Sequence, residues 1–250
     1  MKLVICAGPP ATGKTAVLRH VIKKLLKRGH RPAFFKLDIQ FAEEDGIITR
    51  EFSIPTRKVY SGELCPDHCH VMVLGDGMAW GRKTGSDVLL VETAGLCLRC
   101  SPYVEGGLGV VVLEATSGMN LPLKVGPMLS LADVAVVTKI DRVSQAEREV
   151  FRARIQDVAA NVLIREANAL HGIGLDPLVD MILAINDVGD TTCLRGNPPV
   201  GTCTICVGNK EIGQRSHFGR ARTCDNALSY EDGTAGKHCQ DTVSQFVDVA

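Results

Sequence analysis

The residues whose spacing most clearly predicts chemistry lie near the amino terminus. The pattern Gly-x-x-x-x-Gly-Lys-Thr occupies residues 8–15, after the apolar run of residues 3–7 and before a helical, basic stretch. In such a loop, backbone N–H groups face phosphate oxygens, and the following helix directs its positive end at them. Lys14 would contact the β- and γ-phosphates, and the Thr15 hydroxyl would bind Mg²⁺. The pattern predicts a loop that binds a nucleoside triphosphate.

A second element predicts which base is bound. Thr138-Lys139-Ile140-Asp141 follows an apolar run, and an Asp there can accept hydrogen bonds from guanine N1 and the exocyclic amine, while the Lys stem packs over the base. Adenine offers no matching pair of donors, so we expect GTP rather than ATP; the alternative is an ordinary turn between strand and helix. Asn168 falls where a second base-contacting loop would lie. The predicted nucleotide-binding residues are Gly8, Pro9, Pro10, Ala11, Thr12, Gly13, Lys14, Thr15, Ala16, Lys139, Asp141 and Asn168.

Two acidic residues end predicted strands. Asp38 follows residues 31–37, and Glu92 closes the aliphatic run of residues 88–92. Ligands of parallel sheets bind at the carboxyl ends of the strands. A buried aliphatic strand that ends in an acidic residue is the form of the second magnesium-side strand of phosphate-loop nucleotide hydrolases.

A metal site is predicted between these strands. Cys65, His68, Cys69 and His70 place thiolates and imidazoles within six residues, a composition suited to zinc or nickel. One chain does not easily supply four ligands with good geometry, so a site shared across a two-fold axis is expected. The alternative is the start of a helix with incidental cysteines. Which histidine completes the site is left open.

Further cysteines form two groups. Cys97 and Cys100 directly follow the Glu92-Thr93-Ala94-Gly95 stretch, where a cysteine pair could couple hydrolysis to release of a metal or cluster; the alternative is two small buried apolar residues. The carboxyl-terminal tail is rich in Gly and Cys, which predicts a module held together by zinc or an iron–sulfur cluster. Its candidate ligands are Cys203, Cys206, Cys224 and Cys239.

Composition restricts the class of protein. The chain has 250 residues, 45% of them apolar, and a formal net charge of zero, so neither nucleic acid nor a membrane is an expected partner. We expect no signal peptide and no membrane span, and therefore a cytoplasmic protein. Ten cysteines in a reducing compartment indicate metal ligation rather than disulfides.

Strands and helices alternate along most of the chain, which predicts a mostly parallel, doubly wound α/β sheet of the phosphate-loop type with a small Cys-rich extension. We expect one domain over residues 1–186 and a tail over residues 187–250. Residues 39–56 look irregular, either a solvated loop or a nucleotide-sensing switch. The predicted strands are residues 3–7, 31–37, 58–60, 88–92, 109–114, 134–138 and 160–165, and the predicted helices are residues 15–28, 71–83, 126–132, 144–157 and 175–185.

Over about residues 1–185, the sequence resembles the nickel- and cobalt-handling maturation GTPases typified by UreG, HypB and CobW. The resemblance rests on Gly8 to Thr15, Asp38, Glu44-Asp45, Gly62-Glu63-x-Cys65-Pro66, Glu92-Thr93-Ala94-Gly95 and Thr138-Lys139-x-Asp141. It implies a metal site in the Gly-Glu-x-Cys region, often shared across a GTP-dependent dimer. It also implies that Thr15, Asp38 and Glu92 surround Mg²⁺ and the attacking water, so Lys14, Asp38 and Glu92 are the catalytic candidates.

Three functional hypotheses follow. The first is a GTP-hydrolysing metallochaperone that forms a nucleotide-dependent homodimer and delivers a metal, nickel favoured, to a client metalloenzyme or cofactor-assembly protein. The second is an iron–sulfur protein that uses nucleotide hydrolysis to gate electron transfer or cluster delivery; the surplus cysteines favour it. Pro9 stands where loops of that kind carry a second lysine, which counts against it. The third is a GTPase that guards a corrinoid-dependent enzyme, with purely structural cysteines.

Overall fold

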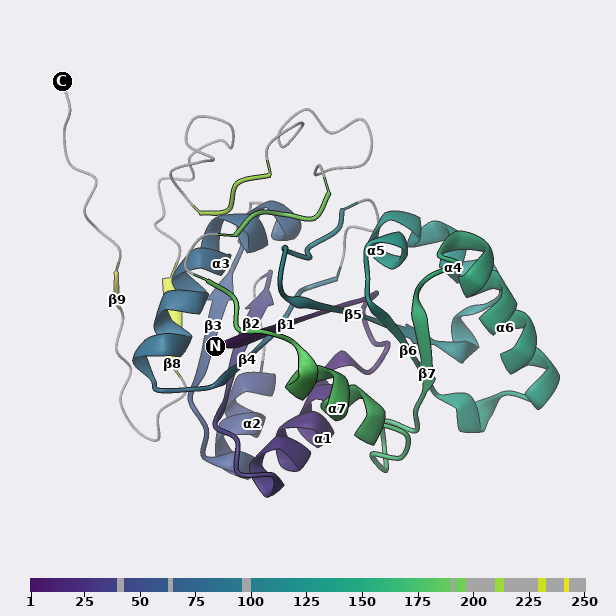
Figure 1. Ribbon diagram of the computed structural model, residues 1–250, viewed down its shortest axis with the longest axis horizontal. Coiled ribbons are helices and arrows are strands. Elements are labelled where there is room, and N and C mark those ends of the chain that lie inside the picture. The colour runs from purple at the N-terminus through teal and green to yellow at the C-terminus, as the bar shows by residue number, and fades with distance from the viewer. Residues whose placement is uncertain are drawn as a thin grey trace.

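The computed structural model describes most of the chain in full (Figure 1). The residues described with their side chains are 1–39, 43–62, 65–95, 100–189, 192–196 and 210–213, and residues 229–232 and 241–242 are described by their backbone alone. Everything said below refers to these residues.

A twisted sheet forms the centre of the molecule. Its strand order is β7-β6-β5-β1-β4-β2-β3-β8-β9; strands β1 to β7 pair in parallel, whereas β8 and β9 are antiparallel. The predicted mostly parallel α/β sheet is thereby confirmed. The strands are β1 Lys2–Ala7, β2 Pro32–Asp38, β3 Thr56–Tyr60, β4 Val88–Glu92, β5 Leu108–Glu114, β6 Val134–Thr138, β7 Leu163–Glu166, β8 Ser229–Asp232 and β9 Asp241–Thr242.

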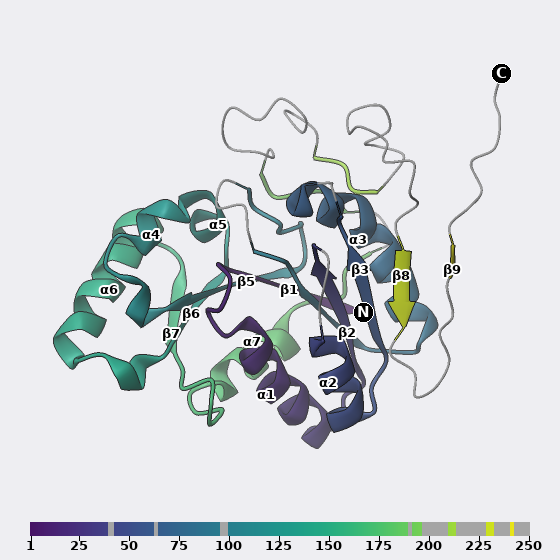
Figure 2. The ribbon, with the colours of Figure 1, turned by 180° about the vertical axis from the view of Figure 1, so that it is seen from behind.

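Helices cover both faces of this sheet (Figures 1 and 2). Helices α1, α2 and α7 pack on one face and α3 to α6 on the other, so the core consists of two apolar layers separated by the strands. Burial on both sides explains why the central strands are almost continuously aliphatic. The helices are α1 Lys14–Lys27, α2 Glu44–Phe52, α3 Pro66–Lys83, α4 Leu121–Lys124, α5 Gly126–Ser130, α6 Gln145–Val158 and α7 Asp176–Ala184, with short 3₁₀ turns η1 Ala115–Ser117 and η2 Ile140–Arg142.

One predicted helix is confirmed in detail and one predicted loop is wrong. Helix α6 begins with the expected capping box, in which Ser144 and Glu147 satisfy each other's backbone N–H groups. Residues 39–56, expected to be irregular, instead contain α2. Gly46 and the β-branched residues of α2 weaken its intrinsic helix propensity, and burial of Ile48 in the core compensates for this.

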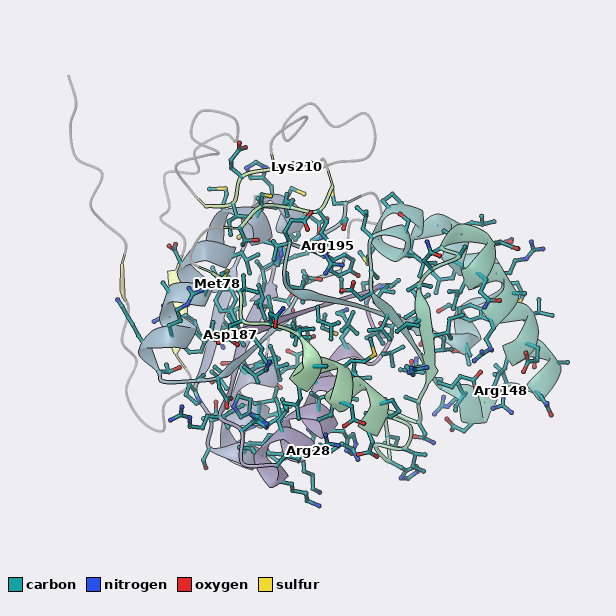
Figure 3. All side chains as sticks on the ribbon, in the orientation of Figure 1. Arg28, Met78, Arg148, Asp187, Arg195 and Lys210 are labelled. Atoms are coloured by element: carbon teal, nitrogen blue, oxygen red, sulfur yellow. The ribbon has the colours of Figure 1, made fainter. Side chains whose placement is uncertain are left out.

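The chain beyond residue 186 continues to pack on the sheet domain. Asp187 forms an ion pair of 2.7 Å with the Met1 amino group, and Leu194 is fully buried. Gly213 donates a backbone hydrogen bond of 3.0 Å to the Val71 carbonyl oxygen of α3. Figure 3 labels Asp187, whose side chain is exposed, and Arg195, which lies higher in this view. The boundary at residue 186 stays a prediction, but these described residues belong to the packed body.

None of the described helices combines the length and the apolar character needed to cross a membrane.

Arg195 holds the segment of residues 192–196 against the sheet domain. Its guanidinium group donates to the carbonyl oxygens of Val104, Leu131 and Gly107, and it lies 2.7 Å from the Asp133 carboxylate. One charged side chain thus satisfies three carbonyl groups at the edge of the core. Hydrogen bonds to charged groups are the strong ones, so removal of this group is costly.

We predict that Arg195→Ala lowers the free energy of unfolding by about 2 to 3 kcal/mol, because the carbonyl oxygens lose a charged donor. Urea denaturation followed by circular dichroism measures the change. Arg154→Ala is the matched control, since Arg154 contacts only the exposed Asp157 at 3.4 Å, and it should change the value by less than about 0.5 kcal/mol. Equal effects of the two substitutions would contradict this role of Arg195.

Candidate nucleotide-binding site

The carboxyl ends of the parallel strands assemble the site. The loop of residues 8–13 leaves β1, Asp38 ends β2, Glu92 ends β4, and residues 139–141 follow β6. In the sheet order β4 lies between β1 and β2, so the phosphate loop and the two acidic residues meet at one edge. The sequence positions of these groups are far apart, and parallel pairing brings them together.

The loop of residues 8–13 has the backbone conformation that phosphate-binding loops need. Gly8 adopts φ of 143°, and a side chain on it would approach the Val112 carbonyl oxygen to 2.2 Å. Gly13, with φ of 93°, leads directly into α1. Both positions therefore require glycine. The start of α1 directs its N–H groups and the positive end of its dipole toward the loop.

Lys14 lies inside this loop. Its Nζ atom donates to the carbonyl oxygens of Gly8 and Pro9, each at 3.0 Å, and its side chain is buried. Burial lowers the pKa of Lys14, and the nearby Glu92 carboxylate offsets only part of that effect. These bonds hold the Lys14 ammonium group inside the loop, where a bound phosphate group would lie next to it.

Thr15 and Glu92 form the acidic side of the site. The Thr15 hydroxyl donates to Glu92 Oε1 at 2.9 Å, and Lys36 Nζ contacts the same oxygen at 2.6 Å. The second oxygen of Glu92 is buried and has no hydrogen-bond partner among the described residues. Hydroxyl and carboxylate oxygens are the donors that Mg²⁺ prefers. The side chains present therefore fit a magnesium ion at Thr15, with Glu92 and Asp38 beside it.

A cavity of about 370 Å³ joins these groups. The phosphate loop, the start of α1 and the ends of β2 and β4 form its walls. It is lined by Pro10, Ala11, Gly13, Lys14, Thr15, Lys36, Asp38, Ile39, Glu44, Glu92 and Ala94. The three predicted catalytic residues, Lys14, Asp38 and Glu92, thus face one cavity, and their catalytic roles stay predictions.

The candidate base-binding residues lie on the other side of the loop. Thr138 donates to the Thr12 carbonyl oxygen at 2.6 Å, and Lys139 donates to the Ala11 carbonyl oxygen at 3.1 Å, so the end of β6 supports the loop directly. Asp141 is exposed on η2, where its carboxylate is open to a ligand. This exposed position is compatible with the predicted contact between Asp141 and guanine, and that contact stays a prediction.

Asn168 is engaged within its own loop. Its side-chain oxygen accepts hydrogen bonds from the backbone N–H groups of Leu170 and His171, at 3.1 and 3.2 Å. The neighbouring Ala169 lies 3.9 Å from the place of a Cβ atom on Gly13, so this loop adjoins the phosphate loop. Asn168 therefore shapes the loop in the described structure, and its predicted contact with a nucleotide stays a prediction.

The candidate metal segment forms the start of α3. Cys65 is the exposed residue before the first turn, whereas His68 and Cys69 are buried. Burial, with a smaller contribution from Cys65, raises the pKa of the Cys69 thiol to about 12. Among the residues that the structure describes, no three His, Cys, Asp or Glu side chains are grouped to hold a metal ion. Of the four candidate ligands in this segment, Cys65 is the exposed one, and the metal site stays a prediction.

His70 is fully buried and contacts a backbone carbonyl group. Its Nε2 atom lies 3.0 Å from the Pro102 carbonyl oxygen, and burial lowers its pKa to about 4, so the ring is neutral. This contact joins the start of α3 to the chain that follows β4. Glu63 of the Gly-Glu-x-Cys element lies outside the described residues. So do five predicted metal ligands, which are Cys97, Cys203, Cys206, Cys224 and Cys239; Cys100 is described and is buried.

Two backbone hydrogen bonds join the candidate metal segment to the nucleotide site. Ser61 donates to the Asp38 carbonyl oxygen at 2.8 Å, and Gly62 donates to the Ile39 carbonyl oxygen at 2.9 Å. The loop that precedes Cys65 is thus fixed to the strand end that carries Asp38.

Lys36 is a residue of the site that no motif in the sequence predicted. A lysine inside an otherwise apolar strand, two residues before Asp38 and therefore on the same face, is the signal that could have identified it. Gly95, quoted above only within a motif, also contacts the loop. Its φ is 74°, and a Cβ atom on it would lie 1.9 Å from the Gly8 carbonyl oxygen.

This fold and this site define a phosphate-loop nucleotide-binding protein. The family described as CobW/HypB/UreG, nucleotide-binding domain, matches residues 2–165. The chain therefore belongs to the CobW/HypB/UreG family, as its motifs predicted.

Individual relatives agree with this assignment. MJ0120 of Methanocaldococcus jannaschii is 41% identical over 233 residues, which cover 92% of this chain and 99% of that protein. Urease accessory protein UreG 2 of Streptomyces griseus is 31% identical over 190 residues, 68% of this chain and 81% of that protein. The crystal structure of HypB from Helicobacter pylori in complex with nickel is similar in fold, with a TM-score of 0.60 at 19% identity over 73% of this chain and 86% of that one.

We predict that Gly95→Ala weakens binding of a fluorescent GTP analogue by about tenfold or more, because the added Cβ would displace the loop at the Gly8 carbonyl group. Gly85→Ala is the control, since Gly85 has a similar φ of 72° but has no atom within 4 Å of its Cβ position. It should cost stability and leave the affinity unchanged. Equilibrium fluorescence titration measures both, and a Gly95 variant that binds as tightly as the control would refute the contact.

Proposed function

We propose that this protein is a GTP-hydrolysing metallochaperone that delivers a metal, nickel favoured, during maturation of a metalloenzyme or metallocofactor. Membership of the CobW/HypB/UreG family supports the general role. The observation that carries the proposal is the direct hydrogen bonding of the loop before Cys65 to the strand end at Asp38. Through it, the state of the nucleotide can change the geometry of the metal segment.

The chain's own residues support hydrolysis in named roles. Lys14 holds the β- and γ-phosphates and offsets charge that develops on the γ-phosphoryl group. Glu92 and Asp38 orient the attacking water at the strand ends, and Thr15 supplies a hydroxyl ligand to magnesium. Bound Mg²⁺ adds charge stabilisation at the phosphate oxygens. The buried position of Lys14 and Glu92 strengthens these electrostatic interactions.

Guanine specificity rests on Asp141. Lys139 is fixed on the phosphate loop through its bond to Ala11, and Asp141 follows it on an exposed turn. A carboxylate there accepts two hydrogen bonds from guanine, whereas adenine supplies no such pair. A site built to pair with donors rejects a base that lacks them.

The metal would be bound and released as cargo. Cys65 is exposed at the start of α3, so two chains related by a two-fold axis could each contribute a thiolate to one ion. GTP would favour the dimer that holds the metal, and hydrolysis would release it to a client protein. The iron–sulfur alternative takes Cys97, Cys100 and the tail cysteines as cluster ligands; Cys100 is buried, and Cys97, Cys203, Cys206, Cys224 and Cys239 lie outside the described residues. Metal analysis separates the two hypotheses.

We predict that Asp141→Asn lowers the affinity for GTP by about tenfold or more and raises that for xanthosine triphosphate. The reason is that the amide donates a hydrogen bond to the C2 oxygen of xanthine, where the carboxylate accepted one from the guanine amine. Competition titrations with both nucleotides and with ATP measure the preference. Asp157→Asn, on the exposed side of α6, is the control. An unchanged preference in the Asp141 variant would remove Asp141 from base recognition.

We also predict that protein purified without oxygen carries nickel, cobalt or zinc without acid-labile sulfide. A Cys65→Ala/Cys69→Ala variant should lose that metal, because the proposed site takes its sulfur ligands from this segment, the exposed Cys65 first. Elemental analysis with a sulfide assay makes the measurement, and a Cys203→Ala/Cys206→Ala variant serves for comparison. Iron with equal sulfide, lost in the second variant and retained in the first, would favour the iron–sulfur alternative.

A further inference from the structure

A second buried lysine, Lys36, faces the nucleotide cavity beside Lys14. It lies on β2 directly opposite Glu92 of β4 in the register of the parallel pair. Its side chain is only 4% exposed, and its Nζ atom contacts Glu92 Oε1 at 2.6 Å. A lysine is rarely buried to this extent unless it is paired, so its position requires the carboxylate beside it.

Three carboxylates surround this ammonium group. Besides Glu92, Asp38 Oδ2 lies 3.4 Å from Lys36 Nζ, and Glu44 Oε1 lies 3.8 Å from it. Burial acts to lower the pKa of Lys36, but the carboxylates, Glu92 first, more than offset this and leave the pKa above its usual value. The lysine is therefore charged, and it is the central cation of an acidic cluster drawn from β2, α2 and β4.

This cluster overlaps the region of the predicted magnesium site. Glu92 Oε1 accepts from both Thr15 and Lys36, while its buried Oε2 has no hydrogen-bond partner among the described residues. Without Lys36, the carboxylates of Glu92, Asp38 and Glu44 would lack the positive charge that lies among them. A divalent cation is the group that oxygen ligands of this kind bind.

We propose that Lys36 is an internal counter-ion that prevents a divalent cation from binding at the acidic side of the phosphate pocket until nucleotide is bound. This inference rests on the proposed function, because it takes the pocket to be the site of a magnesium nucleotide. The phosphate groups supply the extra negative charge that allows an ion and the lysine to be present together. Free divalent ions, including the metal cargo, are thereby kept out of the pocket.

The test measures Mn²⁺, a paramagnetic substitute for Mg²⁺, by electron paramagnetic resonance on the full-length protein without nucleotide. Lys36→Met should bind one Mn²⁺ at least about tenfold more tightly than the unsubstituted protein, because a positive charge next to the ion is removed. Lys36→Arg keeps the charge and should behave as the unsubstituted protein does. In Lys36→Met/Glu92→Gln the added affinity should disappear.

Lys58→Met is the matched control. Lys58 is the register partner of Lys36 on β3, and it lies 3.4 Å from Asp45 and does not line the cavity. Its loss should leave Mn²⁺ binding unchanged. If Lys36→Met binds Mn²⁺ no more tightly than Lys58→Met, or if Lys36→Arg gains the same affinity as Lys36→Met, the counter-ion role is wrong.

Stability gives a second readout if Lys36→Met folds poorly. Mn²⁺ should raise its melting temperature by more than it raises that of the unsubstituted protein, because ligand that binds only the folded state stabilises it. A variant that melts at the same temperature with and without Mn²⁺ would overturn the inference.

A further measurement separates this inference from the proposed function. Mn²⁺ binding is measured on the unsubstituted protein with a non-hydrolysable GTP analogue, and failure to bind Mn²⁺ under that condition would refute the magnesium-nucleotide site. The comparison of variants without nucleotide still decides the role of Lys36.

Discussion

The parallel pairing of β4 with β1 on one side and β2 on the other is the constraint on which the site depends. Cys6, Glu92 and Lys36 are register partners in this triplet, so three residues distant in sequence stand in one row across the sheet. The row places Glu92 within reach of both the Thr15 hydroxyl and the Lys36 ammonium group. The phosphate loop is set by the same pairing, because β1 ends at Ala7 and the loop begins at Gly8. A shift of one residue in either pair would turn the charged side chains to the opposite, apolar face.

Close backbone contacts determine how the phosphate loop and the chain after β4 pack at this edge of the sheet. Gly8 passes against β5 at Val112, and Gly95 passes against Gly8 itself, so neither approach leaves room for a side chain. Pro102 follows Gly95 in the sequence, and its carbonyl oxygen contacts His70 of α3. The Ser61 and Gly62 bonds provide a second connection from the strand end at Asp38. Described contacts thus lie on two sides of the start of α3, one at Pro102 and one at the strand end that carries Asp38.

Local patterns in the sequence predicted much of this arrangement, and long-range packing decided the rest. The phosphate loop, the strand ends at Asp38 and Glu92, and the capping box of Ser144 are short-range signals with direct physical causes. Helix α2 was missed because Gly46 and its β-branched residues lower its helix propensity, and burial of Ile48 in the core stabilises it. Lys36 was missed because its partner, Glu92, is 56 residues away in the sequence. Arg195 was missed for the same reason, since its carbonyl partners lie on loops that only the fold brings together.

The central claim is that the nucleotide state controls metal binding at the start of α3. The most direct test is the equilibrium affinity for Ni²⁺ measured by calorimetry on the same protein with a non-hydrolysable GTP analogue and with GDP. Thermodynamic linkage requires that a nucleotide which favours the metal-binding form raises metal affinity by the same factor by which metal raises nucleotide affinity. The account predicts tighter Ni²⁺ binding with the GTP analogue, by about fivefold or more, and loss of that difference in Cys65→Ala. Equal Ni²⁺ affinities in the two nucleotide states would contradict it.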